Sequence, residues 1–300
     1  MYRFIKFFLL AIIIFSFSSC NKNSKDKNNS NQDYILRLKD TYGQEIKLKT
    51  LPKRIISLSP AITELVFELE SGYKLIGRTD FCNYPEDSVK NIPTVGGINN
   101  ASIEMIISLK PDLVITSSIF TKSMSQTIQN AGIQIISLPE KPEIQGLYET
   151  LNTLGKILDK EEKSKEIIDN FKASLNNITS SRINKSIKPK VYYVIQYGVG
   201  GDFSAGENTF INEIIELSGG DNIAKKTKNW SFSKEEIFAN QPDFIFLRKE
   251  DSSQFIKTHP YNTLNAVKNK RVYGIESSWM DIQSSRTLKA IEYISNIINK

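Results

Sequence analysis

The sequence of 300 residues has few of the side chains on which most enzymes and metal sites depend. It contains one histidine, His259, and two cysteines, Cys20 and Cys82. Zinc and related ions need several nitrogen or sulfur ligands on converging elements, so we expect no metal site. A serine or cysteine triad would have to use His259 as its base, and no G-x-S-x-G nucleophile elbow is present. We therefore expect no catalytic residues and no cofactor.

Nucleotide and nucleic-acid binding also lack a sequence signal. The segment Gly198–Gly206 (GVGGDFSAG) has Phe203 where a dinucleotide fingerprint needs its third glycine, and no Walker pattern occurs. The formal net charge is +6, but basic and acidic residues are interspersed along the chain. Because nucleic-acid binding needs a basic stripe or patch, we expect no nucleic-acid partner.

Long apolar runs are missing as well. The run FFLLAIIIFSF near the N-terminus is shorter than the ~20 residues that a membrane span needs. A basic MYRFIK precedes it and Ser18-Ser19-Cys20 follows, which predicts a lipoprotein signal peptide over 1–19 and a lipidated Cys20. The alternative is ordinary signal-peptidase cleavage beside an unmodified cysteine. No apolar residue occurs in 21–32, so 20–32 is expected to be a lipidated tether that holds an exported protein on a bacterial membrane, facing the periplasm or the cell exterior.

The remaining chain alternates short apolar runs with segments of helical spacing. This pattern predicts an α/β fold with mostly parallel sheets. Between Glu143 and Lys185 there is neither a strand signal nor a proline, which predicts two helices, the second of them long. We expect an N-terminal α/β lobe over 33–160, a long linking helix over 161–187 and a C-terminal α/β lobe over 188–300.

One short pattern occurs twice, once in each predicted lobe. Ser102–Ile115 reads SIEMIISLKPDLVI and Ser233–Phe246 reads SKEEIFANQPDFIF, with Glu104 and Glu235 at matching positions. Each copy reads as a helix cap, a first-turn acid, a helix, a proline stop and a strand. The repeat predicts equivalent units in two lobes, and it raises the question of whether the two glutamates share a role.

Aromatic side chains gather in the loops that follow the predicted strands. Ligands bind in such loops in open α/β sheets, and aromatics there favour a large flat ligand over simple core packing. Both tryptophans of the chain belong to this group, which comprises Phe81, Tyr84, Tyr197, Phe203, Trp230, Phe232 and Trp279, with Met280 beside them.

Several segments, in order along residues 33–300, resemble the solute-binding lipoproteins of ABC importers for vitamin B12, haem and ferric siderophores. They read RIISLSPAITELVFEL, GRTDFCNYPED, PTVGGINNASIEMIISLKPDLVI, GENTFINEIIELSGGDNIA and LNAVKNKRVYGI. Within that group the sequence is most similar to the cobalamin-binding proteins. The resemblance implies two α/β lobes joined by one rigid long helix, with the ligand in the cleft between them. It also implies a monomer that delivers its ligand to an ABC permease dimer with ATPase subunits.

The resemblance also implies roles for individual residues. Glu104 and Glu235 match the glutamates that form salt bridges with permease arginines. The expected ligand contacts are Tyr84, Phe203, Trp230 and the loop Ser278, Trp279, Met280 and Asp281, together with Ile98 and Ser117. Ile98 and Ser117 stand where some vitamin B12 binders have aromatics, and the spacing from Trp230 to Glu235 is one residue shorter.

These departures leave several ligands open. A corrinoid such as cobalamin is the expected ligand, and haem or a ferric siderophore of the same family is the alternative. Tyr84 or Tyr197 could ligate a haem iron, whereas carboxylate siderophores usually need several arginines and only Arg78 and Arg286 are at hand. The alternative from another class is an exported hydrolase or sensor that uses His259.

Overall fold

The computed structural model describes residues 34–117, 121–181 and 187–300. Residues 34–300 form one compact unit. The predicted signal peptide, Cys20 and the tether lie outside the described residues. In the part of the chain that the structure describes, none of the helices has both the length and the apolar character needed to cross a membrane.

The first sheet has four parallel strands in the order β4-β3-β5-β6. They are β3 (Ile55–Ser57), β4 (Leu75–Arg78), β5 (Leu113–Ser117) and β6 (Gln134–Leu138). The side chains of β3 and β5 are buried on both faces of the sheet. Strands buried on both faces read as continuous apolar runs, which explains why the sequence shows runs rather than strict alternation here.

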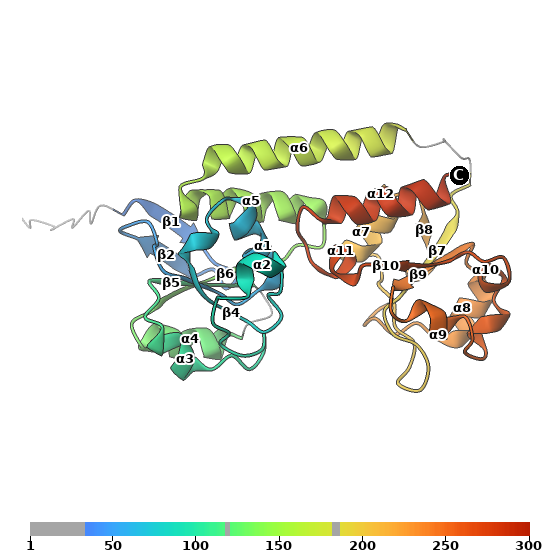
Figure 1. The fold of residues 1–300 in the computed structure, drawn as a ribbon, viewed down its shortest axis with the longest axis horizontal. Helices are drawn as coiled ribbons and strands as arrows, with labels where there is room; N and C mark the ends of the chain where they lie inside the picture. The colour runs from blue at the N-terminus through green and yellow to red at the C-terminus, as the bar shows by residue number, and fades with distance from the viewer. Residues whose placement is uncertain (1–33, 118–120, 182–186) are drawn as a thin grey trace, which may run out of the picture. The chain divides into compact units, whose positions relative to one another are not determined.

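The second sheet repeats this arrangement with β7 (Lys190–Val194), β8 (Asp221–Asn222), β9 (Phe244–Arg248) and β10 (Val272–Ile275). Its strands are parallel in the order β10-β9-β7-β8. Read from β8, the order matches that of the first sheet strand by strand. The predicted α/β class with two mostly parallel sheets is confirmed (Figure 1).

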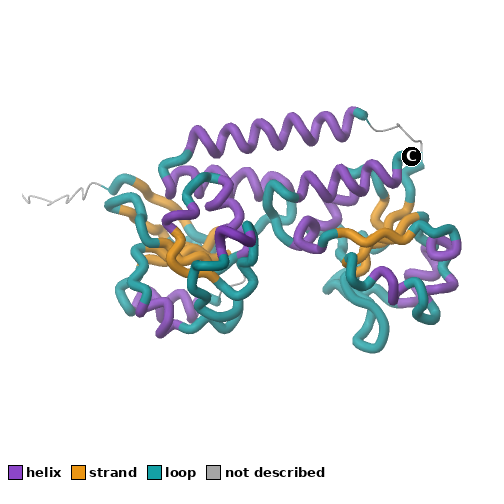
Figure 2. The backbone as a smooth tube through the Cα atoms, in the orientation of Figure 1, coloured by secondary structure: helices purple, strands orange, loops and turns teal. Residues whose placement is uncertain are grey.

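Twelve α-helices lie in the described residues, and Figure 2 shows them distributed around the two sheets. The first six are α1 (Pro60–Glu68), α2 (Glu86–Val89), α3 (Ile103–Ser108), α4 (Lys122–Asn130), α5 (Ile144–Leu158) and α6 (Glu161–Ser180). The others are α7 (Phe210–Leu217), α8 (Lys234–Asn240), α9 (Ser252–Phe255), α10 (Asn265–Lys268), α11 (Ser277–Asp281) and α12 (Thr287–Ile298).

The long helix α6 packs on helices that follow the first and the second sheet. It runs alongside α5 and also contacts α12 (Figure 1). Phe171 of α6 is buried edge-on against Tyr148 of α5, with ring centroids 5.6 Å apart. One apolar core is continuous through these helices and includes residues from each sheet, such as Leu113 and Phe246. Because a packed core resists shear, this continuity favours a fixed geometry between the sheets.

The repeated sequence pattern forms matching units. Ser102 caps α3 and Ser233 caps α8, since each hydroxyl accepts a backbone N–H from the third residue of its helix. Ser233 and Glu236 complete a capping box. Both helices end in a residue with positive φ just before the proline, Lys110 at 49° and Gln241 at 44°.

The two repeated aspartates also have one role. Asp112 accepts hydrogen bonds from the backbone N–H groups of Lys53 and Arg54, just before β3. Asp243 accepts one from the N–H of Lys190, the first residue of β7. Each aspartate therefore fixes the start of the neighbouring strand. The capping serines and the aspartates of the repeat are therefore explained by their structural roles at the helix starts and strand starts.

A small hairpin stands beside the first sheet. Its strands β1 (Leu36–Lys39) and β2 (Glu45–Leu48) pair antiparallel. The backbone N–H of Thr41, in the connecting turn, donates to the carbonyl of Ser137 on β6. The hairpin is thus attached to the edge of the first sheet.

Candidate functional site

A cavity with a volume of about 640 Å³ is lined by residues that follow strands of both sheets. From the first half of the chain it takes Ser59, Pro60, Ala61, Phe81, Asn83, Ile98, Ser117, Glu140, Lys141 and Pro142. From the second half it takes Asn208, Thr209, Phe210, Ile211, Trp230, Ser277, Ser278, Met280, Asp281, Ile282 and Gln283. The cavity therefore lies at the carboxyl ends of the strands, where open α/β sheets bind ligands.

Trp230 is held in the cavity wall by an unusual backbone. Asn229 and Trp230 have φ values of 58° and 66°, a region that bulky residues rarely adopt. The carbonyl of Trp230 accepts a hydrogen bond of 2.8 Å from the N–H of Ser204, which fixes this turn. The side chain remains 47% exposed. A strained residue with an exposed ring in a cavity is typical of a ligand contact.

Asp281 is one of the two acidic residues of the cavity lining. Its carboxylate lies 3.9 Å from the guanidinium of Arg248 and accepts a hydrogen bond of 3.4 Å from the hydroxyl of Tyr193. Burial raises the pKa of Asp281 more than these two partners lower it. Lys141 is already paired with Glu149, 2.7 Å away, so it contributes little free charge to the cavity.

Side chains from the two halves of the chain meet beside this cavity. Arg286, ahead of α12 and 11% exposed at its side chain, donates through Nε to Glu64 of α1 at 2.9 Å and pairs with its other carboxylate oxygen as well. Ser285 donates to Glu68, also on α1, at 2.5 Å. The side-chain amide of Gln283 donates to the carbonyl of Lys141, 3.0 Å away.

A second contact of this kind lies next to the Gln283 contact, at the start of α5. Glu213 of α7 accepts a hydrogen bond from the backbone N–H of Ile144, the first residue of α5. Burial raises the pKa of Glu213, and this hydrogen bond opposes the shift. The two halves of the chain are therefore joined by direct polar contacts at α1 and at the start of α5.

Six of the nine residues predicted as ligand contacts line the cavity together: Ile98, Ser117, Trp230, Ser278, Met280 and Asp281. The other three lie elsewhere. The ring of Tyr84 stacks under the guanidinium of Arg286, 4.0 Å away, beside a separate small pocket. Trp279 packs edge-on against Tyr293 of α12, because SSWMD forms the helix α11 and not the expected loop. Phe203 makes bridge pairs with Gln196 and Ser231 and does not line the cavity.

Sequence reasoning missed three stretches of the cavity lining. These are the start of α1 at Ser59–Ala61, the segment Glu140–Pro142 after β6, and Asn208–Ile211 at the start of α7. Each of these stretches follows a strand of its sheet, and that position was the signal available in the sequence. The first two stretches contain no aromatic residue, so the search for aromatic loops did not find them. His259 is exposed and does not line the cavity.

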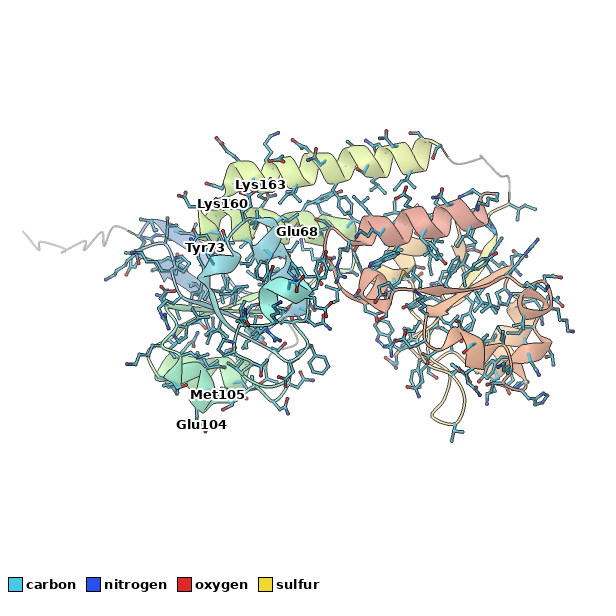
Figure 3. All side chains as sticks on the ribbon, viewed as in Figure 1. Glu68, Tyr73, Glu104, Met105, Lys160 and Lys163 are labelled. Atoms are coloured by element: carbon cyan, nitrogen blue, oxygen red, sulfur yellow. The ribbon has the colours of Figure 1, made fainter. Side chains whose placement is uncertain are left out.

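Glu104 and Glu235 lie outside the cavity, and both are exposed. Figure 3 shows Glu104 and its neighbour Met105 on α3, directed away from the first sheet. A backbone N–H and the Ser102 hydroxyl, 3.0 Å away, lower the pKa of Glu104, so it is a carboxylate at neutral pH. Glu235 is the second residue of α8, and the capping box beside it uses Glu236 instead.

Among the described residues, no group of three or more His, Cys, Asp or Glu side chains is placed to hold a metal ion. Cys82 is buried, with its sulfur 3.1 Å from the hydroxyl of Thr79.

Comparison with known proteins shows which family has this sequence and fold. A family model described as periplasmic binding protein matches residues 55–278. The ABC transporter substrate-binding lipoprotein YvrC of Bacillus subtilis is 27% identical over 285 residues, 92% of this chain and 89% of its own. The vitamin B12-binding protein of Vibrio campbellii is 27% identical over 243 residues, 80% of this chain and 86% of its own. A crystal structure from Staphylococcus epidermidis, described as a possible iron-binding (periplasmic solute-binding) protein, superposes with a TM-score of 0.71 at 25% identity, covering 84% of this chain and all of that one.

Proposed function

The chain belongs to the family of periplasmic binding proteins, and from that premise we propose that it captures a corrinoid in the cavity and delivers it to an ABC permease. Proteins of this family are solute-binding components of transport systems and not enzymes. The cavity, and not His259, is therefore the site at which the protein acts.

The composition of the cavity lining is the observation that carries the proposal. Among the described residues, its lining contains no histidine, tyrosine, cysteine or arginine, and its one methionine, Met280, is only 1% exposed. Haem recognition calls for an axial ligand to the iron and cations for the two propionates. Carboxylate siderophores need several cations as well. A lining with Lys141 as its one cation, already paired with Glu149, suits neither.

A corrinoid suits this lining better. Its broad macrocycle is apolar on its faces and carries neutral amides at its edge. Trp230, Phe81 and Ile98 offer apolar contact, and Asn83, Asn208 and Ser278 offer hydrogen bonds to amides. Such a mixture of apolar surface and a few polar groups is typical of small-molecule pockets.

Delivery is proposed to use the glutamates of the repeated units. Glu104 and Glu235 occupy matching first-turn positions of α3 and α8, and both are exposed. Carboxylates presented in this way can pair with arginines of a partner that has two equivalent halves. Each also lies at a helix start, where the helix dipole favours an acid, so the position is stable without a partner.

The protein is exported, and we propose that a lipid on Cys20 anchors it to the membrane. The B. subtilis relative is a lipoprotein. This chain has the basic segment, the apolar run and the Ser18-Ser19-Cys20 sequence that are typical of a lipoprotein signal peptide.

Titration of residues 21–300 with cyanocobalamin, followed by tryptophan fluorescence, tests the ligand. The two tryptophans differ in place, because Trp230 lines the cavity and Trp279 packs on Tyr293. We expect saturable quenching that Trp230→Phe removes and Trp279→Phe retains. Isothermal titration calorimetry, which needs no tryptophan reporter, should show Trp230→Ala weakening binding about tenfold to a hundredfold, as loss of a central aromatic contact does. Tight haemin binding without saturable cyanocobalamin binding would refute the corrinoid assignment.

Docking needs a separate test. Charge reversal, Glu104→Arg with Glu235→Arg, should abolish corrinoid uptake by cells and leave the fluorescence titration unchanged. Glu236→Gln serves as the matched control, because Glu236 is equally exposed but is engaged in the capping box. A large loss of ligand affinity in the double variant would place the glutamates in ligand binding instead.

A further inference from the structure

The outer face of the β1–β2 hairpin is strongly basic. Along both strands apolar side chains turn toward the first sheet and charged ones turn outward, as the burial alternation shows. The outward side chains are Arg37, Lys39, Glu45 and Lys47, and Lys49 follows just beyond β2. Four cations and one acid give this face a net charge of 4 − 1 = +3. We call the five residues and Tyr34 the basic hairpin face.

The cations are crowded in a way that internal pairing does not explain. Arg37 and Lys47 stand directly opposite each other in the strand register. Like charges in such pairs repel. Both turn to the same Glu45, at 3.7 and 3.0 Å, so one carboxylate serves two cations. The side chains of Arg37 and Lys47 remain 50% and 37% exposed.

An aromatic ring marks the centre of this face. The cationic groups of Arg37, Lys47 and Lys49 lie 5.2, 5.7 and 5.9 Å from the ring centroid of Tyr34. The next residue, Ile35, is 54% exposed. A ring and an exposed aliphatic side chain among cations form the combination that membrane–water interfaces favour.

The basic hairpin face lies close in sequence to Cys20, and this position indicates that its partner is the membrane surface. Tyr34 follows Cys20 by 34 − 20 = 14 positions. A segment of that length spans at most about 50 Å even when fully extended. If Cys20 carries the proposed lipid anchor, the basic hairpin face stays within reach of the bilayer surface, where anionic headgroups attract cations within about one Debye length.

We propose that the basic hairpin face binds anionic phospholipid headgroups and holds the anchored protein against its membrane. The inference rests on the proposed export and anchoring, but the contact itself is electrostatic and needs no acyl chain. It gives the hairpin a function distinct from the cavity and from the two docking glutamates.

Vesicle binding of the non-acylated chain, residues 21–300, tests the inference. These residues include the whole compact unit 34–300. The protein would be sedimented with two kinds of vesicle, at low and at high salt. One kind is a mixture of phosphatidylglycerol and phosphatidylcholine, and the other is phosphatidylcholine alone. We expect binding only to the anionic vesicles and loss of binding at high salt. Each cation near such a surface contributes about fivefold to affinity, so Lys47→Gln/Lys49→Gln should bind about 25-fold more weakly.

The control is Lys268→Gln/Lys270→Gln, which removes the same charge from two exposed lysines at the end of α10. We expect it to bind less than threefold more weakly. Equal losses in the two variants would show attraction by net charge alone and overturn the proposal, as would the absence of binding to anionic vesicles. Cyanocobalamin titration of the same samples separates this outcome from the proposed ligand, because neither lysine pair lines the cavity.

Discussion

Replacing Glu64 by glutamine tests how the two walls of the cavity are held together. The side chain of Glu64 is 2% exposed and that of its partner Arg286 is 11% exposed. Arg286 also donates to the hydroxyl of Ser278 at 3.0 Å and stacks on the ring of Tyr84. Glu64→Gln removes the negative charge that pairs directly with this guanidinium, and only the more distant Glu68 remains as an acid beside it.

Breaking a buried ion pair by removing one partner costs about 3–5 kcal/mol of folding free energy. The amide oxygen of glutamine still accepts one hydrogen bond from Arg286, whose contacts with Ser278 and Tyr84 remain, so we expect a loss near the lower limit, about 3 kcal/mol. For a compact unit of the size of residues 34–300, each kcal/mol lowers the midpoint by ~2–4 °C, which gives a fall of roughly 6–12 °C.

Urea unfolding at pH 7 measures the free energy, and calorimetry measures the midpoint. Asp169→Asn is the matched control, since Asp169 pairs with Lys165 at 2.5 Å on an exposed face of α6 and should have no measurable effect. The double variant Glu64→Met/Arg286→Met should be far more stable than the sum of its single variants, because it removes both charges together. A loss below about 1 kcal/mol for Glu64→Gln would refute the claim that this pair is energetically buried.

Two further predictions concern α1 and the α5–α6 pair. Burial raises the pKa of Glu68 above 4.5, so its contribution to stability is full below that pH and is lost as the pH rises through the raised pKa. Glu68→Gln, which is neutral throughout, should therefore gain stability relative to the wild type as the pH rises from 4.5 to 8, measured by urea unfolding; a constant difference would contradict the raised pKa. Phe171→Ala should cost about 3–5 kcal/mol, because its buried ring fills the space beside Tyr148. Thermal unfolding checks this, with Asn170→Ala, its exposed neighbour on α6, as control; equal losses would contradict the packing argument.

The alternation of apolar runs and helical segments was sufficient to predict the α/β class, because strands and helices differ in hydrophobic period over a few residues. The repeated pattern predicted equivalent units, and the caps at Ser102 and Ser233 and the strand-fixing aspartates are local features of that kind. The bounds 33–160, 161–187 and 188–300 stay predictions. The long helix is described to Ser180, and residues 182–186 lie outside the described part.

The predicted ligand contacts fall into two groups, those that local sequence position places correctly and those whose side chains turn elsewhere. Trp230, Ser278 and Asp281 line the cavity as the sequence suggested, since they follow strands and the carboxyl ends of parallel strands meet at one edge. Tyr84 and Trp279 follow strands too, but their rings turn to Arg286 and to Tyr293. Which way a loop side chain turns depends on partners that are distant in sequence, and no local pattern encodes them.

The sequence by itself determined the α/β alternation, the repeated cap–helix–strand unit and the scarcity of histidine and cysteine, because each depends on composition or on neighbours along the chain. Only the tertiary structure decided that Glu64 meets Arg286 across 222 positions, that the described residues lining the cavity include no arginine or tyrosine, and that four cations share one face of a hairpin. These features arise where distant segments pack together, and the free energy of that packing depends on pairs of residues that the linear order does not bring into contact.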